Sequence, residues 1–168
     1  CILFTHTTIG WTLSTSPDTT YFLREKTLWA TNVDLKEIQI SDKKVGDFKL
    51  SPDKRLLAFN SGTFLFVFNA KTGTTTTVTD SYSVGLEYPS GDRFVWTADS
   101  KSLLFAKNKK VLIGIYLYNI RKGESLSLGD FSLRDIDFKV SPDEKKILHI
   151  YSQSGAPLIN ALYLQDIK

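Results

Sequence analysis

The sequence predicts an all-β protein, a β-propeller with about four blades of four antiparallel strands each. One short phrase recurs along the 168 residues, with spacings of 35, 46 and 44 residues between its first positions. Repeats of this period are typical of solenoids and propellers. Aromatic residues make up 12% of the chain, and strands favour aromatic and β-branched side chains. The four copies are Ser16-Pro17-Asp18, Ser51-Pro52-Asp53, Thr97-Ala98-Asp99 and Ser141-Pro142-Asp143.

The recurring phrase has the chemistry of a tight turn. Proline is preset for the first central position of a β-turn, and the aspartate after it can accept hydrogen bonds from nearby backbone N–H groups. Each copy follows a short apolar run and precedes a longer one. The phrase therefore predicts a β-turn between the first and second strands of each unit.

Apolar and β-branched runs recur in the same order around every turn, so each complete unit is expected to contain four strands. The first unit has strands at 11–15, 21–24, 28–33 and 37–40, and the second at 47–50, 55–59, 64–68 and 74–79. The third has strands at 93–97, 102–106, 113–120 and 125–128, and the fourth, which lacks its outermost strand, at 135–140, 146–151 and 160–167. We therefore expect blades over residues 11–46, 47–92, 93–134 and 135–168, with residues 1–10 as a strand of a neighbouring or closing blade.

The predicted strand at 113–120 is apolar on both faces. Its side chains alternate between one face with Ile113, Ile115 and Leu117 and another with Tyr116, Tyr118 and Ile120. A strand between two blades needs two apolar faces, whereas a half-exposed strand shows a polar one. A β-sandwich would not repeat one turn phrase at this spacing, and the coils of a parallel β-helix are shorter.

The second unit carries the fullest form of a known repeat. It reads Ser-Pro-Asp-x-x-x-Leu-Ala-Phe from Ser51 to Phe59 and Asn-x-x-x-Gly from Asn69 to Gly73. This pattern resembles the PD-type propeller repeats of TolB-like proteins and of the propeller domains of prolyl-oligopeptidase and dipeptidyl-peptidase enzymes. The resemblance covers about residues 11–168. It is weaker at 97–123 and weakest in the first unit, whose turn between the third and fourth strands lacks glycine.

The resemblance implies a ring of about six to eight blades. The chain contains about four, so we expect it to be part of a larger propeller. The alternative is a closed ring of four blades in which residues 2–7 supply the missing outer strand. In an unclosed arrangement the two end blades would each expose an apolar face, and self-association through those faces would follow.

The sequence offers no catalytic, cofactor-binding or metal-binding set. The segment nearest to the Gly-x-Ser-x-Gly nucleophile elbow is 151–155, which lacks the first glycine and is expected in a hairpin loop. His6 and His149 have no metal ligand at a suitable spacing. No glycine-rich phosphate loop occurs. The repeated acids are interpreted as turn residues, one for each blade: Asp18, Asp53, Asp99 and Asp143.

Two other groups of residues are candidates for a binding or active site. The tryptophans Trp11, Trp29 and Trp96 are potential stacking platforms, but Trp96 directly precedes a turn phrase and is expected to pack between blades. An active site in the propeller channel would draw on residues near the innermost strands. These are Asp47, Arg93, Asp135 and Asp137, which form no recognisable set.

The net charge and the cysteine content limit the classes of partner that the sequence predicts. The net charge of +3 is mildly basic, and the single basic run, 107–110, is expected at a solvated hairpin tip, so no nucleic-acid partner is predicted. No apolar stretch approaches the ~20 residues of a membrane helix. Cys1 is the only cysteine. It would suit a lipid anchor, but the apolar residues after it favour an excerpt of a longer chain. The resemblance to TolB-like proteins implies the bacterial periplasm or cell envelope.

Two functions remain open from the sequence. The first is a non-catalytic binding or scaffold module that uses the rigid propeller surface to bind a protein or peptide. The alternative is part of the substrate-gating propeller of a serine peptidase whose catalytic domain lies outside this chain. Neither function requires a cofactor within these residues.

Overall fold

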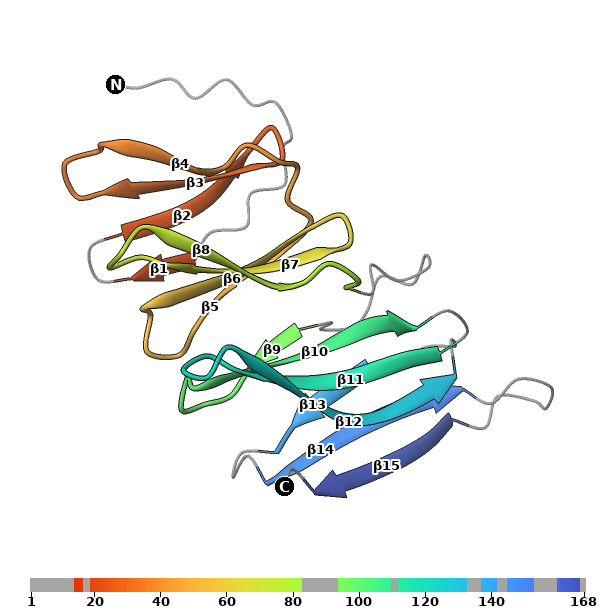
Figure 1. The fold of residues 1–168 in the computed structure, drawn as a ribbon. Helices are drawn as coiled ribbons and strands as arrows, with labels where there is room; N and C mark the ends of the chain where they lie inside the picture. Colours follow the sequence, from red (N-terminus) through yellow and green to blue (C-terminus); the bar gives the residue numbers. More distant parts are fainter. Residues whose placement is uncertain are drawn as a thin grey trace.

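The computed structural model describes residues 14–16, 19–82, 94–109, 112–132, 137–141, 145–152 and 160–166. Within these ranges the chain forms strands and no helix. The strands build four antiparallel sheets that follow one another along the chain, and Figure 1 shows these sheets stacked. In each sheet the strands lie in sequence order. The predicted all-β architecture of a partial propeller is confirmed.

Each sheet is one blade. Blade 1 contains β1 (Ser14–Ser16), β2 (Thr19–Arg24), β3 (Thr27–Asn32) and β4 (Glu37–Ser41). Blade 2 contains β5 (Phe48–Leu50), β6 (Leu56–Ser61), β7 (Phe64–Asn69) and β8 (Thr74–Thr79). Blade 3 contains β9 (Phe94–Trp96), β10 (Ser102–Lys109), β11 (Leu112–Asn119) and β12 (Glu124–Ser132). Blade 4 contains β13 (Asp137–Val140), β14 (Lys146–Ser152) and β15 (Asn160–Asp166).

Blade 3 departs most from the expected strand ends. Its strands β10 and β12 continue to Lys109 and Ser132, beyond the predicted ends at 106 and 128. Residues 107–109 therefore belong to a strand, and the expectation that they form a hairpin tip was wrong. Pairing with β11 holds them in the sheet, since Lys107 and Lys109 lie opposite Gly114 and Leu112.

The turn phrase of blade 2 is held by hydrogen bonds from its first and third residues. Ser51 is only 2% exposed, and its Oγ accepts a bond from the Leu56 backbone N–H at 3.0 Å and donates to Asp53 Oδ1 at 2.6 Å. The same carboxylate oxygen accepts from the Arg55 N–H at 3.1 Å. Lys54 sits at φ 62°, in the left-handed region that closes the turn.

Blade 3 repeats this arrangement without proline. Thr97 Oγ1 accepts from the Ser102 N–H at 3.0 Å and donates to Asp99 Oδ1 at 2.8 Å. In blade 4, Ser141 Oγ accepts from the Lys146 N–H at 2.9 Å. The hydroxyl and the carboxylate thus satisfy the backbone of the turn, which explains why Thr-Ala-Asp replaces Ser-Pro-Asp without loss of the strand pair.

The cross-strand register aligns aromatic residues in every blade. We call the resulting row, which lies on one face of each blade, the aromatic ladder. It comprises Phe22 and Trp29 in blade 1, Phe48, Phe59 and Phe66 in blade 2, and Phe94, Phe105 and Tyr116 in blade 3. The same register positions of blade 4 hold Phe138, His149 and Tyr163.

The core consists of apolar layers between successive blades. The ladder faces of blades 2 and 3 each pack against the opposite, mostly aliphatic face of the blade before them. Between blades 2 and 3, Ala58, Leu65 and Val67 meet Phe94 and Phe105.

Trp96 joins the same layer. It is 7% exposed, and its indole N–H donates to the Lys49 backbone oxygen of blade 2 at 2.9 Å. The predicted packing of Trp96 between blades is confirmed.

The outermost strands of blades 1 to 3 share a β-bulge. In each strand the pairing shifts by one residue, at Ile40 in β4, Val78 in β8 and Leu128 in β12. These three residues are apolar: Ile40 and Val78 pack against the layers between blades, and Leu128 packs against the buried residues of blade 3. The bulge therefore turns one side chain of each outer strand into the core and bends the outer edge.

Candidate functional site

The residues singled out in the sequence do not meet in one site within the described part of the chain. Asp53 and Asp99 lie in separate turns, and His149 lies in β14 opposite Phe138 and Tyr163. The Asp47 carboxylate accepts a hydrogen bond from the Phe48 N–H at 2.8 Å, at the start of β5. Asp137 begins β13. The other candidates lie outside the described residues: Cys1, His6, Trp11, Asp18, Arg93, Asp135, Asp143 and the segment 153–155.

The turn carboxylates are held in their ionised form by local bonds. Burial raises the pKa of Asp53, but hydrogen bonds from Ser51 and Arg55 outweigh it and leave the pKa below its ordinary value. The pKa of Asp99 is lowered in the same way by its bonds to the Lys101 backbone and Thr97. These acids therefore serve the turns, as the sequence predicted. Among the described residues, no group of three or more His, Cys, Asp or Glu side chains is arranged to hold a metal ion.

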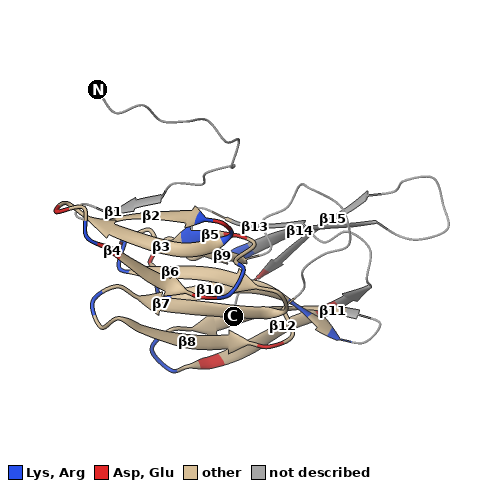
Figure 2. Cartoon of the chain, turned by 90° about the horizontal axis from the view of Figure 1, so that it is seen from above, with Lys and Arg blue, Asp and Glu red and all other residues tan. Residues whose placement is uncertain are grey.

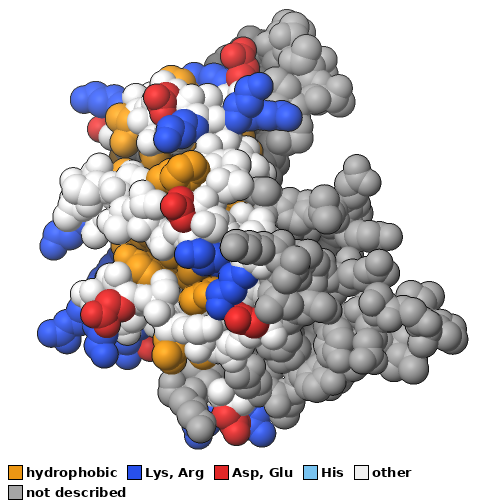
Figure 3. Space-filling view, turned by 45° about the vertical axis from the view of Figure 1, so that its right-hand side comes forward, with side chains coloured by type: hydrophobic (Ala, Val, Ile, Leu, Met, Phe, Trp, Pro, Cys, Tyr) orange, Lys and Arg blue, Asp and Glu red, His pale blue; other side chains and the backbone are white. Residues whose placement is uncertain are grey.

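The most distinctive surface lies at one end of the blades. We call it the hairpin end, because it carries the β2–β3 and β6–β7 turns together with the end of β10 and the start of β11, on the right in Figure 1. The connections between blades meet these turns: the Val45 N–H donates to Lys26 O at 2.6 Å and the Tyr82 N–H to Thr63 O at 2.7 Å. Figure 2 shows charged residues of both signs near the ends of the strands. Figure 3 is turned so that this end comes forward, and it shows hydrophobic side chains next to Lys and Arg side chains.

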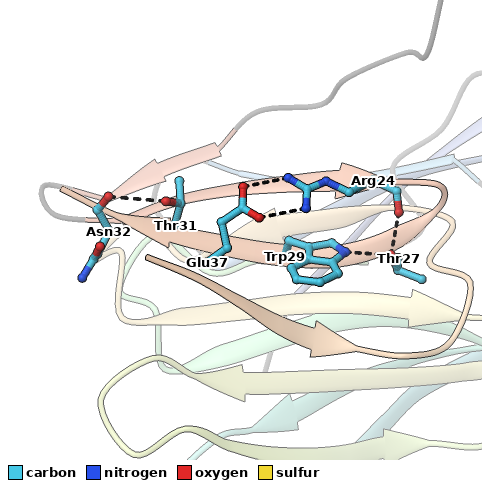
Figure 4. A network of polar contacts seen from close by, with 6 residues as sticks. All are labelled: Arg24, Thr27, Trp29, Thr31, Asn32 and Glu37. Carbon is cyan, nitrogen blue, oxygen red and sulfur yellow. Dashed lines mark hydrogen bonds and ion pairs between the residues drawn. The ribbon is translucent and has the colours of Figure 1, made fainter. Parts of the chain in front are cut away.

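A cation lies over the aromatic ladder at the hairpin end of each of blades 1 to 3. In blade 1 this cation is Arg24, whose guanidinium carbon lies 5.0 Å from the Trp29 ring centroid and 5.3 Å from that of Phe22. Glu37 of β4 binds both terminal nitrogens of Arg24, at 2.8 and 2.7 Å, as Figure 4 shows. This hydrogen bonding lowers the pKa of Glu37 and raises that of Arg24. Thr27 Oγ1 accepts the indole N–H of Trp29 at 2.8 Å.

Blade 3 places lysines over its ladder. Lys109 Nζ lies 5.4 Å from the Tyr116 ring centroid and contacts both carboxylate oxygens of Asp130, at 2.7 and 2.9 Å. Hydrogen bonds to Asp130 and Tyr116 raise the pKa of Lys109. Gly114 leaves the room that this cluster needs, since a Cβ there would lie 2.6 Å from the Tyr116 ring and 3.0 Å from Asp130 Oδ1.

Blade 2 has an exposed aromatic stack under its cation. Phe66 stacks on Phe59 at 5.2 Å between centroids and on Phe64 at 5.8 Å, so the stack runs from the core to the surface. Phe64 is 39% exposed. Lys43 Nζ lies 5.4 Å from the Phe64 centroid and 5.8 Å from that of Phe66. Ser41 Oγ positions Lys43 by accepting its backbone N–H at 3.1 Å.

The ladder face of blade 1 carries polar side chains as well as apolar ones. The positions taken by Leu57 in blade 2 and Leu103 in blade 3 hold Thr20 in blade 1, opposite Thr31. Phe22 on this face is 7% exposed, and the guanidinium carbon of Arg24 lies 5.3 Å from its ring centroid. Thr20, Arg24 and Thr31 thus make the ladder face of blade 1 partly polar, and self-association through end faces stays a prediction.

The cation–aromatic arrangement of the hairpin end was not predicted from the sequence. Its signal was present as aromatic pairs equally distant from each hairpin turn, such as Phe22 with Trp29 and Phe59 with Phe66. The cations gave no such signal, because Lys43 comes from a connection between blades whereas Arg24 comes from a strand.

No profile of a known protein family matches the chain. No curated protein sequence is significantly similar to it. Solved structures are similar in fold. TolB from Acinetobacter baumannii shares 20% identity at a TM-score of 0.58 over 83% of this chain and 35% of its own length. Dipeptidyl peptidase 4 from Porphyromonas gingivalis shares 14% identity at a TM-score of 0.64 over 92% and 31%.

A third similar structure is the β-propeller domain of the Trilobed protease from Pyrococcus furiosus, which is described as having an open velcro topology. It shares 15% identity with the chain at a TM-score of 0.62, over 94% of this chain and 55% of its own length. The chain therefore covers at most 55% of each of these three structures. At these identities the likeness establishes the β-propeller fold. The described residues include no helix long and apolar enough to cross a membrane.

Proposed function

We propose that this chain, which has the β-propeller fold of TolB-like proteins and of peptidase propeller domains, is a non-catalytic module that binds a protein or peptide partner. The single observation that carries the proposal is the exposed aromatic stack with Lys43 at the hairpin end of blade 2. Exposed aromatic side chains beside a cation are typical of the anchors of binding interfaces.

The rigidity of the surroundings supports this role. Phe64 rests on Phe66, and Phe66 in turn rests on Phe59, which is 2% exposed. A surface side chain that is stacked on the core loses little further freedom on binding, so more of the contact energy appears as affinity.

The test uses the full chain and a pool of random peptides displayed on beads. Phe64→Ala is expected to reduce capture about tenfold, since a buried anchor contributes about 1.4 kcal/mol or more. The matched control is Leu126→Ala, because Leu126 is 51% exposed on β12 and lies opposite Leu117, away from the hairpin end. Equal losses in the two variants would contradict the proposal, as would the absence of any captured peptide.

A second candidate is a part of the gating propeller of a serine peptidase, since two of the three similar structures come from peptidases. The chain would then admit or exclude peptides by size while a separate domain cleaves them. The coding sequence around this chain distinguishes the two functions. A downstream Gly-x-Ser-x-Gly segment would favour the gate, and its absence would favour the independent binding module.

A further inference from the structure

Blade 2 lacks the carboxylate that completes the same arrangement in its neighbours. In blades 1 and 3 the outermost strand supplies an acid to the cation over the ladder: Glu37 to Arg24 and Asp130 to Lys109. The outermost strand of blade 2 is β8, which consists of threonines and one valine. Lys43 forms no ion pair with any residue that the structure describes.

The acid nearest to β8 in the sequence serves a different contact. Asp80 directly follows β8, and its Oδ1 accepts a hydrogen bond from Ser81 Oγ at 2.8 Å. This bond, together with the nearby charge of Lys107 in blade 3, lowers the pKa of Asp80. Asp80 therefore faces the next blade, and the ammonium of Lys43 is exposed over Phe64 and Phe66 without a counter-ion from the described residues.

The outer edge of β8 is also open to a partner. β8 is the last strand in the order β5-β6-β7-β8, and Thr74 to Thr77 are all exposed. The bulge lies beyond them at Val78, so these four residues keep regular pairing with β7 and a regular outer edge. Proteins usually protect such an edge with charged residues or proline, and β8 contains neither.

These two features lie next to each other. Phe66 lies opposite Thr77 in the pairing of β7 with β8, so the cation over Phe66 stands beside the end of β8. A strand added to the outer edge would run about 4.8 Å from β8. Its side chains on the ladder face would then point to the same side as Lys43, as those of Glu37 and Asp130 do in the outer strands of blades 1 and 3.

We propose that β8 and Lys43 together bind an extended peptide, which adds a fifth strand to blade 2 and sets an Asp or Glu side chain against Lys43. The inference deepens the proposed function and rests on it. Backbone hydrogen bonds along Thr74–Thr77 hold the peptide, and its alternate side chains provide specificity. The acid completes the pairing that Glu37 and Asp130 complete in the other blades, and the peptide covers exposed Phe64.

The experiment uses the full chain and a fluorescently labelled peptide of about eight residues in which Val alternates with Glu and Thr. A second peptide has Gln in place of each Glu. Binding of the Glu peptide is expected to slow backbone amide exchange at 74–79. It is expected to be about threefold tighter than binding of the Gln peptide, as an exposed ion pair allows. This preference should weaken at high salt.

Two variants remove the preference by different routes. Lys43→Met keeps the side-chain length over Phe64 without the charge, and Thr77→Glu gives Lys43 a carboxylate from within the chain. Both should bind the Glu and Gln peptides equally. The matched control is Thr76→Glu, which adds the same charge to the opposite face of β8, opposite Val67, and should keep a preference for Glu over Gln.

The possible outcomes separate the inference from the proposed function. If the two peptides bind wild type equally, or if slowed exchange falls outside 74–79 while peptides still bind, the inference is wrong and the binding module stands. If neither the peptides nor the random pool binds, both proposals fall. If exchange at 74–79 slows with protein concentration alone, β8 pairs with a second copy, which has no acid in β8 to offer Lys43, and the inference is overturned.

Discussion

Blades 1 and 2 share one cross-strand register, but different groups pack over their aromatic ladders. In blade 2, Phe59 lies against blade 1 and is 2% exposed. In blade 1, Phe22 occupies the same register position on a face turned away from blade 2, where Arg24 lies over its ring and pairs with Glu37.

The difference shows what a neighbouring blade contributes. Among the described residues, blade 2 packs against a neighbour on both faces, whereas no described blade packs against the ladder face of blade 1. Thr20 and Thr31 make this face of blade 1 more polar, where blade 2 has Leu57 and Phe68. The aromatic ladder is thus common to both blades, whereas the groups that pack over it differ.

The largest expected effect compares Phe59→Ala with Phe22→Ala. Phe59→Ala should lower the free energy of unfolding by about 3–5 kcal/mol, because it leaves a cavity in the layer between two blades. Phe22→Ala should cost about 2 kcal/mol, because Arg24 can settle into the space over Trp29. Urea unfolding followed by circular dichroism measures both. Equal losses would mean that the Arg24–Glu37 cover packs as well as a neighbouring blade does.

Much of this fold was readable from the sequence because turns and strands obey local rules. The phrases Ser51-Pro52-Asp53 and Thr97-Ala98-Asp99 located the first turns of blades 2 and 3. Asn69 with Gly73 and Asn119 with Gly123 located the last turns, where each glycine has a positive φ. Hydrophobic alternation then identified strands on both sides. These signals depend only on residues close together in the sequence, so they can be interpreted without knowledge of the tertiary structure.

The candidate site was not readable in the same way. Lys43 reaches Phe64 across a gap of 21 positions in the sequence, through a connection whose path depends on Ser41 and on the turn of blade 1. Lys107 was expected in a turn because lysines are typical of solvated loops. Opposite Gly114, however, its backbone continues the strand and its Nζ lies 5.9 Å from the Tyr116 ring centroid. Such contacts follow from tertiary packing and not from local pattern.

A smaller effect is expected in the turns that join the third and fourth strands of the two blades. Gly73 in blade 2 has φ 68° with nothing near its Cβ position, and Leu35 in blade 1 adopts φ 58° while 80% exposed. Gly73→Ala should cost about 1 kcal/mol from backbone strain alone. Leu35→Gly should stabilise by about 0.5 kcal/mol, because relief of about 1–2 kcal/mol exceeds the added entropy cost of glycine.

Thermal unfolding of the two turn variants measures this difference. Gly62→Ala serves as a control, since Gly62 also has a positive φ and an open Cβ position but lies in a different turn. A loss of stability in Leu35→Gly would show that the exposed leucine contributes a contact that outweighs its strained backbone.

The smallest expected effect is the pH dependence of the stability that Glu37 contributes in blade 1 and Lys43 in blade 2. Arg24 holds the pKa of Glu37 below its ordinary value of 4.5, so the ion pair contributes stability that is fully present above 4.5 and is lost as the pH falls through the lower, folded value. The difference in melting temperature between wild type and Glu37→Gln should therefore be present at about pH 7 and vanish at about pH 2.5. Lys43→Met in blade 2 should shift the melting temperature equally at both pH values, since no carboxylate of the described residues pairs with Lys43. A Glu37→Gln difference that persists in acid would show that Glu37 covers Trp29 by packing and not by charge. Packing by Arg24 and Glu37 over the ladder of blade 1 would then stabilise it without a contribution from their charges, as the apolar residues of blade 1 do over the ladder of blade 2.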